Sequence, residues 1–307
     1  MKYAIGIDIG GTKIGIALGD GRGKILAYRE IATGIRSETQ ACVKELVFNL
    51  KSLVHESRIS RKQILGIGVG CPGAVNTQKG ILPRSPNLPG WAGLPLVKIL
   101  SKATGLPVFI GNDANAAALG EGFWGAGKNT KNFIYITVST GIGGGIVIEG
   151  RLYEGSGFVA GEIGHMSIVP DGKRCKCGKR GCLEAYASGT AIAGFFRRQT
   201  GKPGLKVSAR EVGMAAQRGN KSAIGSYKKA GYFLGIGIAN LLNILNPGKV
   251  VIGGGVLKSA HKIFWTTMMK SAKRHAWPEA FRTVRIVRSQ LKGHVGDLGA
   301  LALVFKH

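Results

Sequence analysis

Acidic residues are scarce in this chain, which has 16 aspartates and glutamates against 43 lysines and arginines in 307 residues. The resulting net charge of +27 attracts polyanions and anionic substrates. The basic residues are nevertheless scattered, without an arginine-rich block or interleaved aromatic residues. We therefore interpret the charge as a generally basic surface and keep a nucleic-acid interface as the alternative.

Long apolar runs and a leader peptide are also missing. No apolar stretch reaches the length of a membrane span. The N-terminal segment MKYAIGIDIGGTK has no charged-then-apolar leader and no small-residue cleavage site, and it enters a strand at once. We expect a cytoplasmic protein with no membrane partner, of a size that suits two domains better than one.

Cysteine is the third scarce residue, with five in the chain. Because cytosolic thiols stay reduced, Cys42 and Cys71 are expected to be small buried hydrophobes, and clustered cysteines are more often metal ligands than disulfides. One cluster has the spacing H-x9-C-x-C-x4-C and consists of His165, Cys175, Cys177 and Cys182. Three thiolates and an imidazole predict a closed, structural zinc site, and the surrounding lysines and arginines favour the thiolate form. A redox motif would need C-x-x-C, and disulfide pairing would leave one cysteine over.

Glycine is abundant, with 50 residues, and it marks the ends of apolar runs that follow the same order twice. Each copy reads as strands, a helix, a strand and a further helix, with a glycine-rich first turn. Such a duplication predicts two related α/β lobes that face each other across a cleft. We expect one lobe at residues 1–116 plus 296–307 and the other at 117–295, with a zinc-binding insert at 162–184.

The glycine-rich first turns suggest phosphate binding, because glycine lets backbone N–H groups approach an anion closely. The chain continues into a second strand after each turn, which excludes a P-loop. A third glycine turn follows the strand KVVIG and suits backbone packed flat against a base or ribose. The nucleotide-binding candidates are Gly10, Gly11, Thr12, Lys13, Thr140, Gly141, Gly143, Gly253, Gly254 and Gly255.

Polar side chains at a strand-to-helix junction supply the catalytic candidates. Asn112 and Asp113 occupy such a junction, where side chains point into a cleft in α/β folds, although either could simply cap the helix. As a functional residue, Asp113 would be the general base that takes a proton from an attacking hydroxyl. Glu162 and Glu184 flank the cysteine cluster, so a metal there would hold both carboxylates as acceptors for sugar hydroxyls. Ion pairs with nearby basic residues are the alternative for both.

These motifs resemble those of the ROK sugar kinases, which belong to the actin-like (ribonuclease H-like) and hexokinase-type ATPase superfamily. DIGGT resembles the first phosphate motif of that family, STGIGGGI the second and VVIGGG the adenosine motif. GCPGAV and NDAN resemble its sugar-side segments. GEIGHM and CKCGKRGCLE match its zinc-containing stretch, including the ligand spacing. The resemblance extends over nearly the whole chain.

The resemblance implies an ATP-dependent hexokinase of glycolysis that phosphorylates the 6-hydroxyl of a hexose, and the glucokinase branch is the most similar. It implies ATP, Mg²⁺ and a structural Zn²⁺ as cofactors, and a homodimer. Asp8 would lie near the magnesium, and His165 would use one nitrogen for zinc and the other for the sugar. The implied sugar-binding residues are Gly73, Asn87, Asn112, Asp113, Glu162, His165 and Glu184.

Several alternatives stay open within this interpretation. N-acetylglucosamine and N-acetylmannosamine kinases share the zinc motif, and polyphosphate could replace ATP as the phosphoryl donor. Other members of the family are transcriptional repressors with a helix-turn-helix before the first strand, and we expect none here because a strand starts at Lys2. A sugar-responsive, nucleic-acid-binding regulator is therefore the alternative from a different class of protein.

Overall fold

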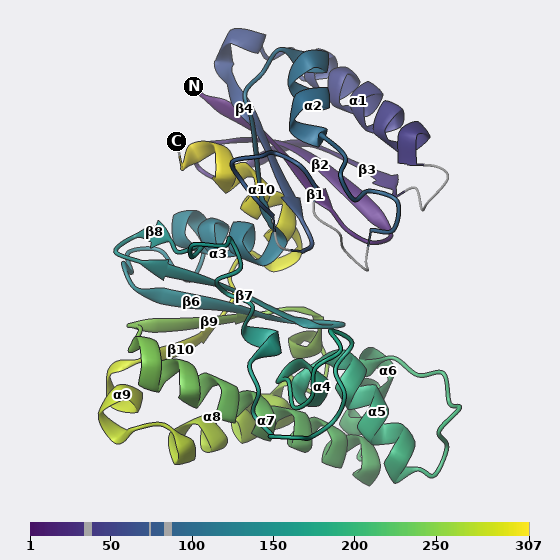
Figure 1. Ribbon diagram of the computed structural model, residues 1–307, viewed down its shortest axis with the longest axis vertical. Helices are drawn as coiled ribbons and strands as arrows, with labels where there is room; N and C mark the ends of the chain where they lie inside the picture. Colours follow the sequence, from purple (N-terminus) through teal and green to yellow (C-terminus); the bar gives the residue numbers. More distant parts are fainter. Residues whose placement is uncertain (34–38, 74, 83–87, 307) are drawn as a thin grey trace. The chain divides into compact units, whose positions relative to one another are not determined.

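The computed structural model describes residues 1–33, 39–73, 75–82 and 88–306 (Figure 1). The chain divides into two compact units, each built from separate stretches of sequence. Unit 1 comprises residues 1–131, 145–161 and 289–307. Unit 2 comprises residues 132–144 and 162–288. Among the helices within the described ranges, none is both long and apolar enough to cross a membrane.

The first sheet forms the centre of unit 1 and has the strand order β3-β2-β1-β4-β5. β1 pairs antiparallel with β2 and parallel with β4, which in turn pairs parallel with β5. The strands are β1 (Tyr3–Ile9), β2 (Lys13–Asp20), β3 (Ile25–Ala32), β4 (Ile64–Cys71) and β5 (Val108–Asn112). The helices of this unit are α1 (Thr39–Glu56), α2 (Leu96–Thr104), α3 (Asp113–Trp124) and α10 (Val295–Phe305), with a 3-10 turn at Arg61–Gln63 and another at Lys292–His294.

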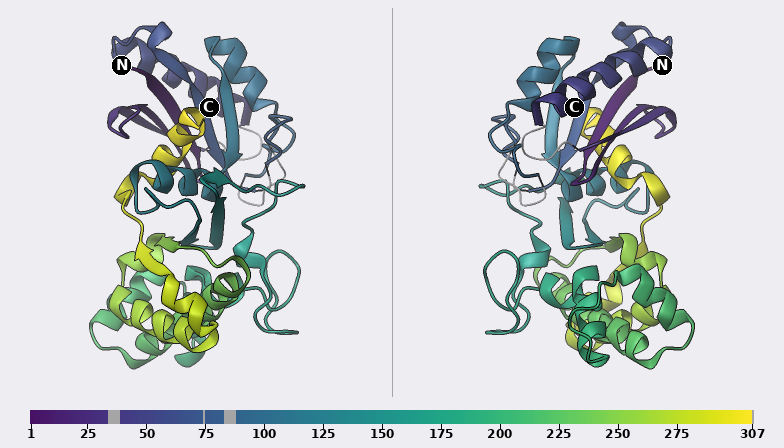
Figure 2. Two further views of the ribbon diagram at one scale, coloured as in Figure 1. Left: turned by 90° about the vertical axis from the view of Figure 1, so that its left-hand side faces the viewer. Right: turned by 90° about the vertical axis from the view of Figure 1, so that its right-hand side faces the viewer.

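Alternate residues of β1 face different helices, as the two-residue period of a strand requires. Ile5, Ile7 and Ile9 join the apolar core that includes residues of α1 and α2. Ala4 instead packs with Leu298, Leu301 and Val304 of α10. Helix α10, drawn in yellow, therefore lies against the strands of the first sheet (Figure 2). Because Asp8 is also even-numbered, its side chain belongs to the face that α10 covers.

The second sheet repeats the strand order of the first, β10-β9-β6-β7-β8. β7 and β8 form an antiparallel hairpin, and β6 pairs in parallel with β9. The central strand of the first sheet, β1, pairs with β4 in the same way. The strands are β6 (Phe133–Val138), β7 (Ile142–Ile148), β8 (Arg151–Leu152), β9 (Lys249–Gly253) and β10 (Arg285–Arg288). This repetition confirms the duplication predicted from the apolar runs.

Helices form most of the remainder of unit 2, and α7 lies beside α4, α5, α6 and α8 (Figure 1). The predicted long helix at 219–246 is α7, which begins after the cap Asn220 and ends before the left-handed Asn246. The helices are α4 (Glu184–Ala187), α5 (Gly189–Gln199), α6 (Ala209–Gln217), α7 (Lys221–Leu245), α8 (His261–His275) and α9 (Pro278–Thr283), with 3-10 turns at Ile163–His165 and Gly255–Lys258.

Two glycines of β4 allow a test of how closely α10 packs on the first sheet. A Cβ atom at Gly68 would overlap the backbone carbonyl of Ala300 in α10, whereas one at Gly70 would meet its nearest atom at 3.8 Å. We expect Gly68→Ala to lower the free energy of unfolding by about 1–3 kcal/mol, because α10 must shift. Gly70→Ala is the matched control and should change it by less. Chemical unfolding of both variants measures the difference, and equal stabilities would contradict the close packing.

Candidate functional site

Unit 2 contains a candidate ligand cavity of about 900 Å³. It lies between the turn at Ser139–Thr140, helices α5 and α6, and the segment 255–259. Its volume falls in the range of small-molecule and cofactor sites. Of the residues predicted to bind nucleotide, Thr140 and Gly255 line this cavity.

The turn at residues 139–141 is held against the N-terminus of α5. The Gly189 N–H donates to the Ser139 carbonyl at 2.7 Å, and the Thr190 hydroxyl donates to the Thr140 carbonyl at 2.8 Å. Ser188 caps the helix by accepting from the Ala191 N–H. The N–H groups of Gly189, Thr190 and Ala191 are thus engaged by the turn and the cap, so that only the dipole of α5 favours an anion at this end of the cavity.

The third glycine turn closes the other side of the cavity. Gly254 has φ +99°, and a Cβ atom there would overlap the backbone of Val138, so that no other residue fits without a shift of the chain. Gly253 ends β9, and Gly143 lies within β7. Three basic lining residues, Arg197, Arg210 and Lys258, were not predicted, because no motif joins them in the sequence.

The first glycine-rich turn, in unit 1, is a hairpin whose polar groups are partly paired. The Gly10 N–H donates to the Lys13 carbonyl at 2.9 Å, and Thr33 bonds to the carbonyls of Gly10 and Thr12. The Lys13 Nζ lies 2.6 Å from a carboxylate oxygen of Glu30 on the neighbouring strand. This pairing raises the pKa of Lys13 and lowers that of Glu30. The lysine charge stays beside the turn in the form of an exposed ion pair.

Three carboxyl groups of unit 1 gather beside this turn. Burial, and then the charges of Asp297 and Asp113, raise the pKa of Asp8 to about 7. Burial also raises the pKa of Asp297, although His294, whose Nδ1 lies 3.1 Å from its Oδ2, lowers it in part. A Cβ atom at Gly296 would overlap the Asp8 carboxylate, so that α10 begins directly against it. A divalent cation with oxygen ligands would relieve the mutual repulsion of these groups.

Asp297 was not among the residues predicted from the sequence. It lies in the first turn of α10, and only the packing of α10 on the even-numbered face of β1 brings it towards Asp8. The sequence signal was weak, since a single acidic residue at the start of a helix is favoured by the helix dipole alone. The structure therefore adds a carboxylate to the predicted set.

The junction of β5 and α3 separates the roles of Asn112 and Asp113. The Asn112 side chain caps α3, accepting from the N–H groups of Ala114 and Asn115, while its Nδ2 donates to the Gly73 carbonyl at 3.1 Å. The Asp113 carboxylate accepts from the Ala114 N–H at 2.8 Å. Asp113 lies in a crowded recess where desolvation raises its pKa, but it still reaches solvent. A carboxylate of this kind is available as a proton acceptor.

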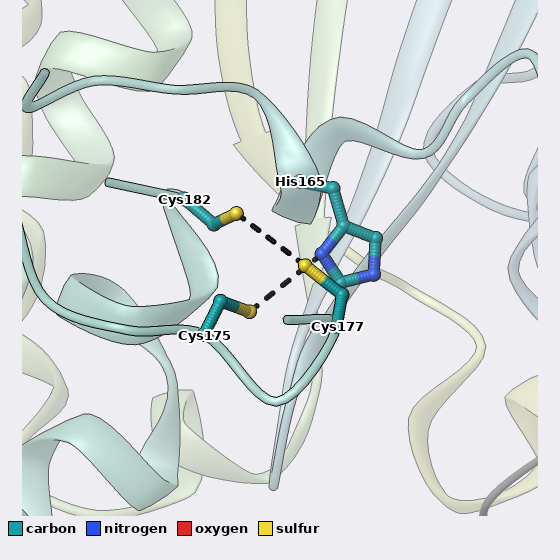
Figure 3. Close-up of side chains that lie close together, drawn as sticks. All are labelled: His165, Cys175, Cys177 and Cys182. Carbon is teal, nitrogen blue, oxygen red and sulfur yellow. Dashed lines mark hydrogen bonds between the residues drawn. The ribbon is translucent and has the colours of Figure 1, made fainter. Parts of the chain in front are cut away.

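His165, Cys175, Cys177 and Cys182 come together in unit 2 (Figure 3). All four ligand atoms lie within 4.8 Å of one another. The Cys175 Sγ is 3.8 Å from the His165 Nδ1, and the Sγ atoms of Cys177 and Cys182 are 3.7 Å apart. Ligands about 2.0–2.3 Å from a tetrahedral metal ion are separated by roughly 3.3–3.8 Å, so these pairs fit such an ion.

The thiol groups of this cluster are costly to ionise without a cation. Burial raises the pKa of Cys182 to about 12 and also raises that of Cys175. Only the pKa of Cys177 is lowered, chiefly by the Lys179 backbone N–H. These shifts arise from burial and from the contacts of the cysteines with one another and with the backbone, and the expected help of lysines and arginines to the thiolates stays a prediction. The donor set fits a metal ion that supplies the missing positive charge.

Both candidate carboxylates of unit 2 adjoin this cluster. The His165 ring turns Nδ1 to the cysteines and Nε2 to Glu162, whose Oε2 is 3.8 Å away. The Glu184 Oε2 accepts from the Ile142 N–H at 2.9 Å, and its Oε1 lies 3.9 Å from the Cys175 Sγ. A Cβ atom at Gly141 would overlap the Glu184 carboxylate. Glu184 thus connects the cluster to the turn at residues 139–141.

The predicted site residues divide between the two units. Asn87 lies outside the described residues. Those of unit 1 are Asp8, Gly10, Gly11, Thr12, Lys13, Gly73, Asn112 and Asp113. Those of unit 2 are Thr140, Gly141, Gly143, Glu162, His165, Cys175, Cys177, Cys182, Glu184, Gly253, Gly254 and Gly255.

The chain is similar over its full length to sugar kinases and to regulators. The model of the ROK family matches residues 4–307. A glucokinase from Halalkalibacterium halodurans is 37% identical over 297 residues, which cover 93% of this chain and 88% of that glucokinase. A xylose repressor from Bacillus subtilis is 30% identical, over 99% of this chain and 77% of the repressor.

Solved structures show the same fold. A ROK hexokinase from Thermus thermophilus has a TM-score of 0.88 and 34% identity, covering 99% of this chain and 98% of the hexokinase. A ROK family glucokinase from Streptomyces griseus, in complex with glucose and AMPPNP, has a TM-score of 0.84 and 32% identity, covering 99% and 100%. These similarities confirm the predicted α/β fold class with two actin-like sheets.

The raised pKa of Asp8 gives a pH-dependent test. Because this pKa is about 7 in the folded chain and 3.8 ordinarily, Asp8 lowers the free energy of unfolding progressively as the pH rises from about 4 to 7, and the loss is complete above pH 7. Asp8→Asn stays neutral, so we expect it to raise the free energy of unfolding by up to about 4 kcal/mol at pH 8 and by little at pH 4. Chemical unfolding without added magnesium measures this, with the exposed Asp171→Asn as the control. A difference between Asp8→Asn and the unsubstituted protein that does not change with pH would contradict the assignment.

Proposed function

The chain belongs to the ROK family, and we propose that it is a glucokinase that transfers the γ-phosphoryl group of ATP to the 6-hydroxyl of glucose. The observation that carries the chemistry is the β5–α3 junction, where Asn112 is engaged as the helix cap and Asp113 keeps an accessible carboxylate. Glucose is favoured as the substrate because several curated glucokinases are 33–37% identical to this chain over nearly its full length. N-acetylglucosamine and N-acetylmannosamine are the alternative substrates.

Asp113 is the general base of this proposal. Its carboxylate accepts the proton of the sugar hydroxyl as that oxygen attacks the phosphorus. The raised pKa of Asp113 makes it a stronger proton acceptor than an ordinary aspartate. Asn112, fixed by its bonds to α3 and to the Gly73 carbonyl, offers an amide beside the base to orient the sugar. Asn87 is proposed as a further sugar contact from the resemblance alone.

ATP is the proposed phosphoryl donor. The adenosine would occupy the cavity lined by Thr140 and Gly255, with its phosphates near the N-terminus of α5. From the resemblance, the hairpin at residues 10–13 of unit 1 is also proposed as a phosphate-binding turn. Asp8 and Asp297 are the residues that would hold Mg²⁺, which would offset the negative charge that develops on the phosphoryl oxygens.

Zn²⁺ is the proposed ion at His165, Cys175, Cys177 and Cys182, because three thiolates and an imidazole form a closed tetrahedral set. Its role would be structural, since no ligand position is left for a substrate. The ordered loop would present Glu162, Glu184 and the His165 Nε2 as partners for sugar hydroxyls. From the resemblance we also propose a cytoplasmic homodimer.

Replacement of Asp113 tests the base. We expect Asp113→Asn to lower kcat for glucose by about 10²–10⁴-fold, because the amide keeps the shape but cannot take the proton. The KM for glucose should change only a few-fold. Coupled assays with glucose, N-acetylglucosamine, N-acetylmannosamine, mannose and fructose measure activity and specificity together, and Asp171→Asn serves as the control.

Two outcomes of these assays would change the proposal. If a folded Asp113→Asn variant kept most of its turnover, the base assignment would be wrong. If the unsubstituted protein used polyphosphate but not ATP, the donor would change while the base could stay.

Removal of a zinc ligand tests the metal. We expect one zinc ion per chain by elemental analysis, and its loss from Cys177→Ser, together with a lower melting temperature, because the loop loses its cross-link. Cys42→Ser is the control, since Cys42 belongs to unit 1 and is not one of the four clustered residues, and the substitution should leave the zinc content unchanged. A zinc-free but equally stable and active protein would contradict the structural role.

A further inference from the structure

Three basic side chains of unit 2 converge on the ring of Phe195. The Lys173 Nζ is 3.6 Å from the ring centroid, the Lys229 Nζ 5.0 Å and the Arg198 Cζ 5.2 Å. They come from three segments: the loop before Cys175, helix α7 and helix α5. Helices α5 and α7 pack against each other, which explains how the three charges meet (Figure 1).

This arrangement is unfavourable for the cations by themselves. Because all three charges lie within 5.2 Å of one ring centre, each pair is within about 10 Å, roughly the Debye length at 0.1 M salt. Across the described parts of the chain, no carboxylate forms an ion pair with Lys173, Arg198 or Lys229. A single aromatic ring provides only about 0.5–1 kcal/mol to an exposed cation.

The surroundings hold the Phe195 ring and the Lys173 backbone in place. Phe195 is buried in the apolar core of unit 2. Lys173 is anchored through its backbone, since its N–H donates to the Tyr186 hydroxyl at 2.6 Å and its carbonyl accepts from the Gly181 N–H at 3.0 Å. The Lys173 amine also lies 4.8 Å from the Tyr186 ring, over a largely apolar floor. An apolar floor strengthens the attraction of fixed cations for an anion.

We propose that Lys173, Arg198 and Lys229 form a binding site for a phosphate-bearing anion, separate from the nucleotide cavity. A phosphate group at pH 7 carries between one and two negative charges and presents several acceptor oxygens, which matches three converging cationic donors. Arg198 can bind two of these oxygens at once, and the two lysines act as point charges. The ligand is either inorganic phosphate or a small phosphate ester.

The position of this site connects it to the rest of unit 2. Arg198 follows Arg197, which lines the nucleotide cavity from the same helix. Tyr186, whose hydroxyl accepts from the Lys173 N–H, belongs to α4. This helix begins with Glu184, which adjoins the cysteine cluster. A bound phosphate would thus contact side chains from α5, from α7 and from the cysteine loop at residues 173–181. We expect its binding to raise the melting temperature of the protein.

Isothermal titration calorimetry on the full-length, zinc-loaded protein tests the proposal. Inorganic phosphate and glucose 6-phosphate are titrated separately at fixed ionic strength, with AMPPNP and glucose present in excess to occupy the proposed catalytic site. We expect saturable binding of one anion per chain, weakened at least tenfold in the double variant Arg198→Gln, Lys229→Gln. Lys228→Gln, next to Lys229 on α7 but not on the Phe195 ring, is the matched control and should bind within twofold of the unsubstituted protein.

The outcomes show whether the site binds an anion and which phosphate compound is the ligand. Binding of inorganic phosphate alone would identify a free ion as the ligand, and tighter binding of glucose 6-phosphate would identify a phosphate ester. Absence of saturable binding, or equal binding by the double variant, would overturn the proposal and mean that solvent and the C-terminal end of the α5 dipole balance the three charges. If the double variant failed to fold, the exposed single variant Lys229→Gln would give the same comparison.

Discussion

The close approach of α10 to the first sheet is the constraint on which the arrangement of unit 1 depends. Glycines at positions 6 and 68 leave no room for a side chain between the strands and the helix backbone. That contact sets the start of α10 against Asp8 and brings Asp297 to the same carboxyl group. A shift of this helix would therefore alter both the packing of unit 1 and the electrostatic interactions among Asp8, Asp113 and Asp297.

Much of the fold could be predicted from the sequence, because apolar runs bounded by glycine occur in the same order twice. The cluster of His165 with three cysteines was also predictable, since its residue types and spacing specify the chemistry locally. Asp297 and the cavity residues Arg197, Arg210 and Lys258 were not, because only tertiary packing brings them to their sites. For Asn112 the sequence left two roles open, a helix cap and a functional side chain. The structure shows that the Asn112 side chain caps α3.

The cysteine loop depends on contacts of a different kind from those of the two sheets. Most of residues 173–181 are exposed, and their order rests on a few backbone hydrogen bonds and on the side chains that converge at the cluster. Such a segment buries too little apolar surface to fold by hydrophobic packing alone. Glu184 and Tyr186, at the start of α4, transmit the order of this loop to the turn at 139–141 and to Lys173.

The division of unit 1 into three stretches of sequence has a consequence for biosynthesis. Its sheet is made from residues 3–112, but the helix that covers the even-numbered face of β1 consists of residues 295–305. During translation the nascent chain must therefore carry that apolar face uncovered while all of unit 2 is synthesised. At about 5–20 residues per second, this interval lasts roughly 10–40 seconds, during which the uncovered apolar face is a surface on which the emerging chain can aggregate.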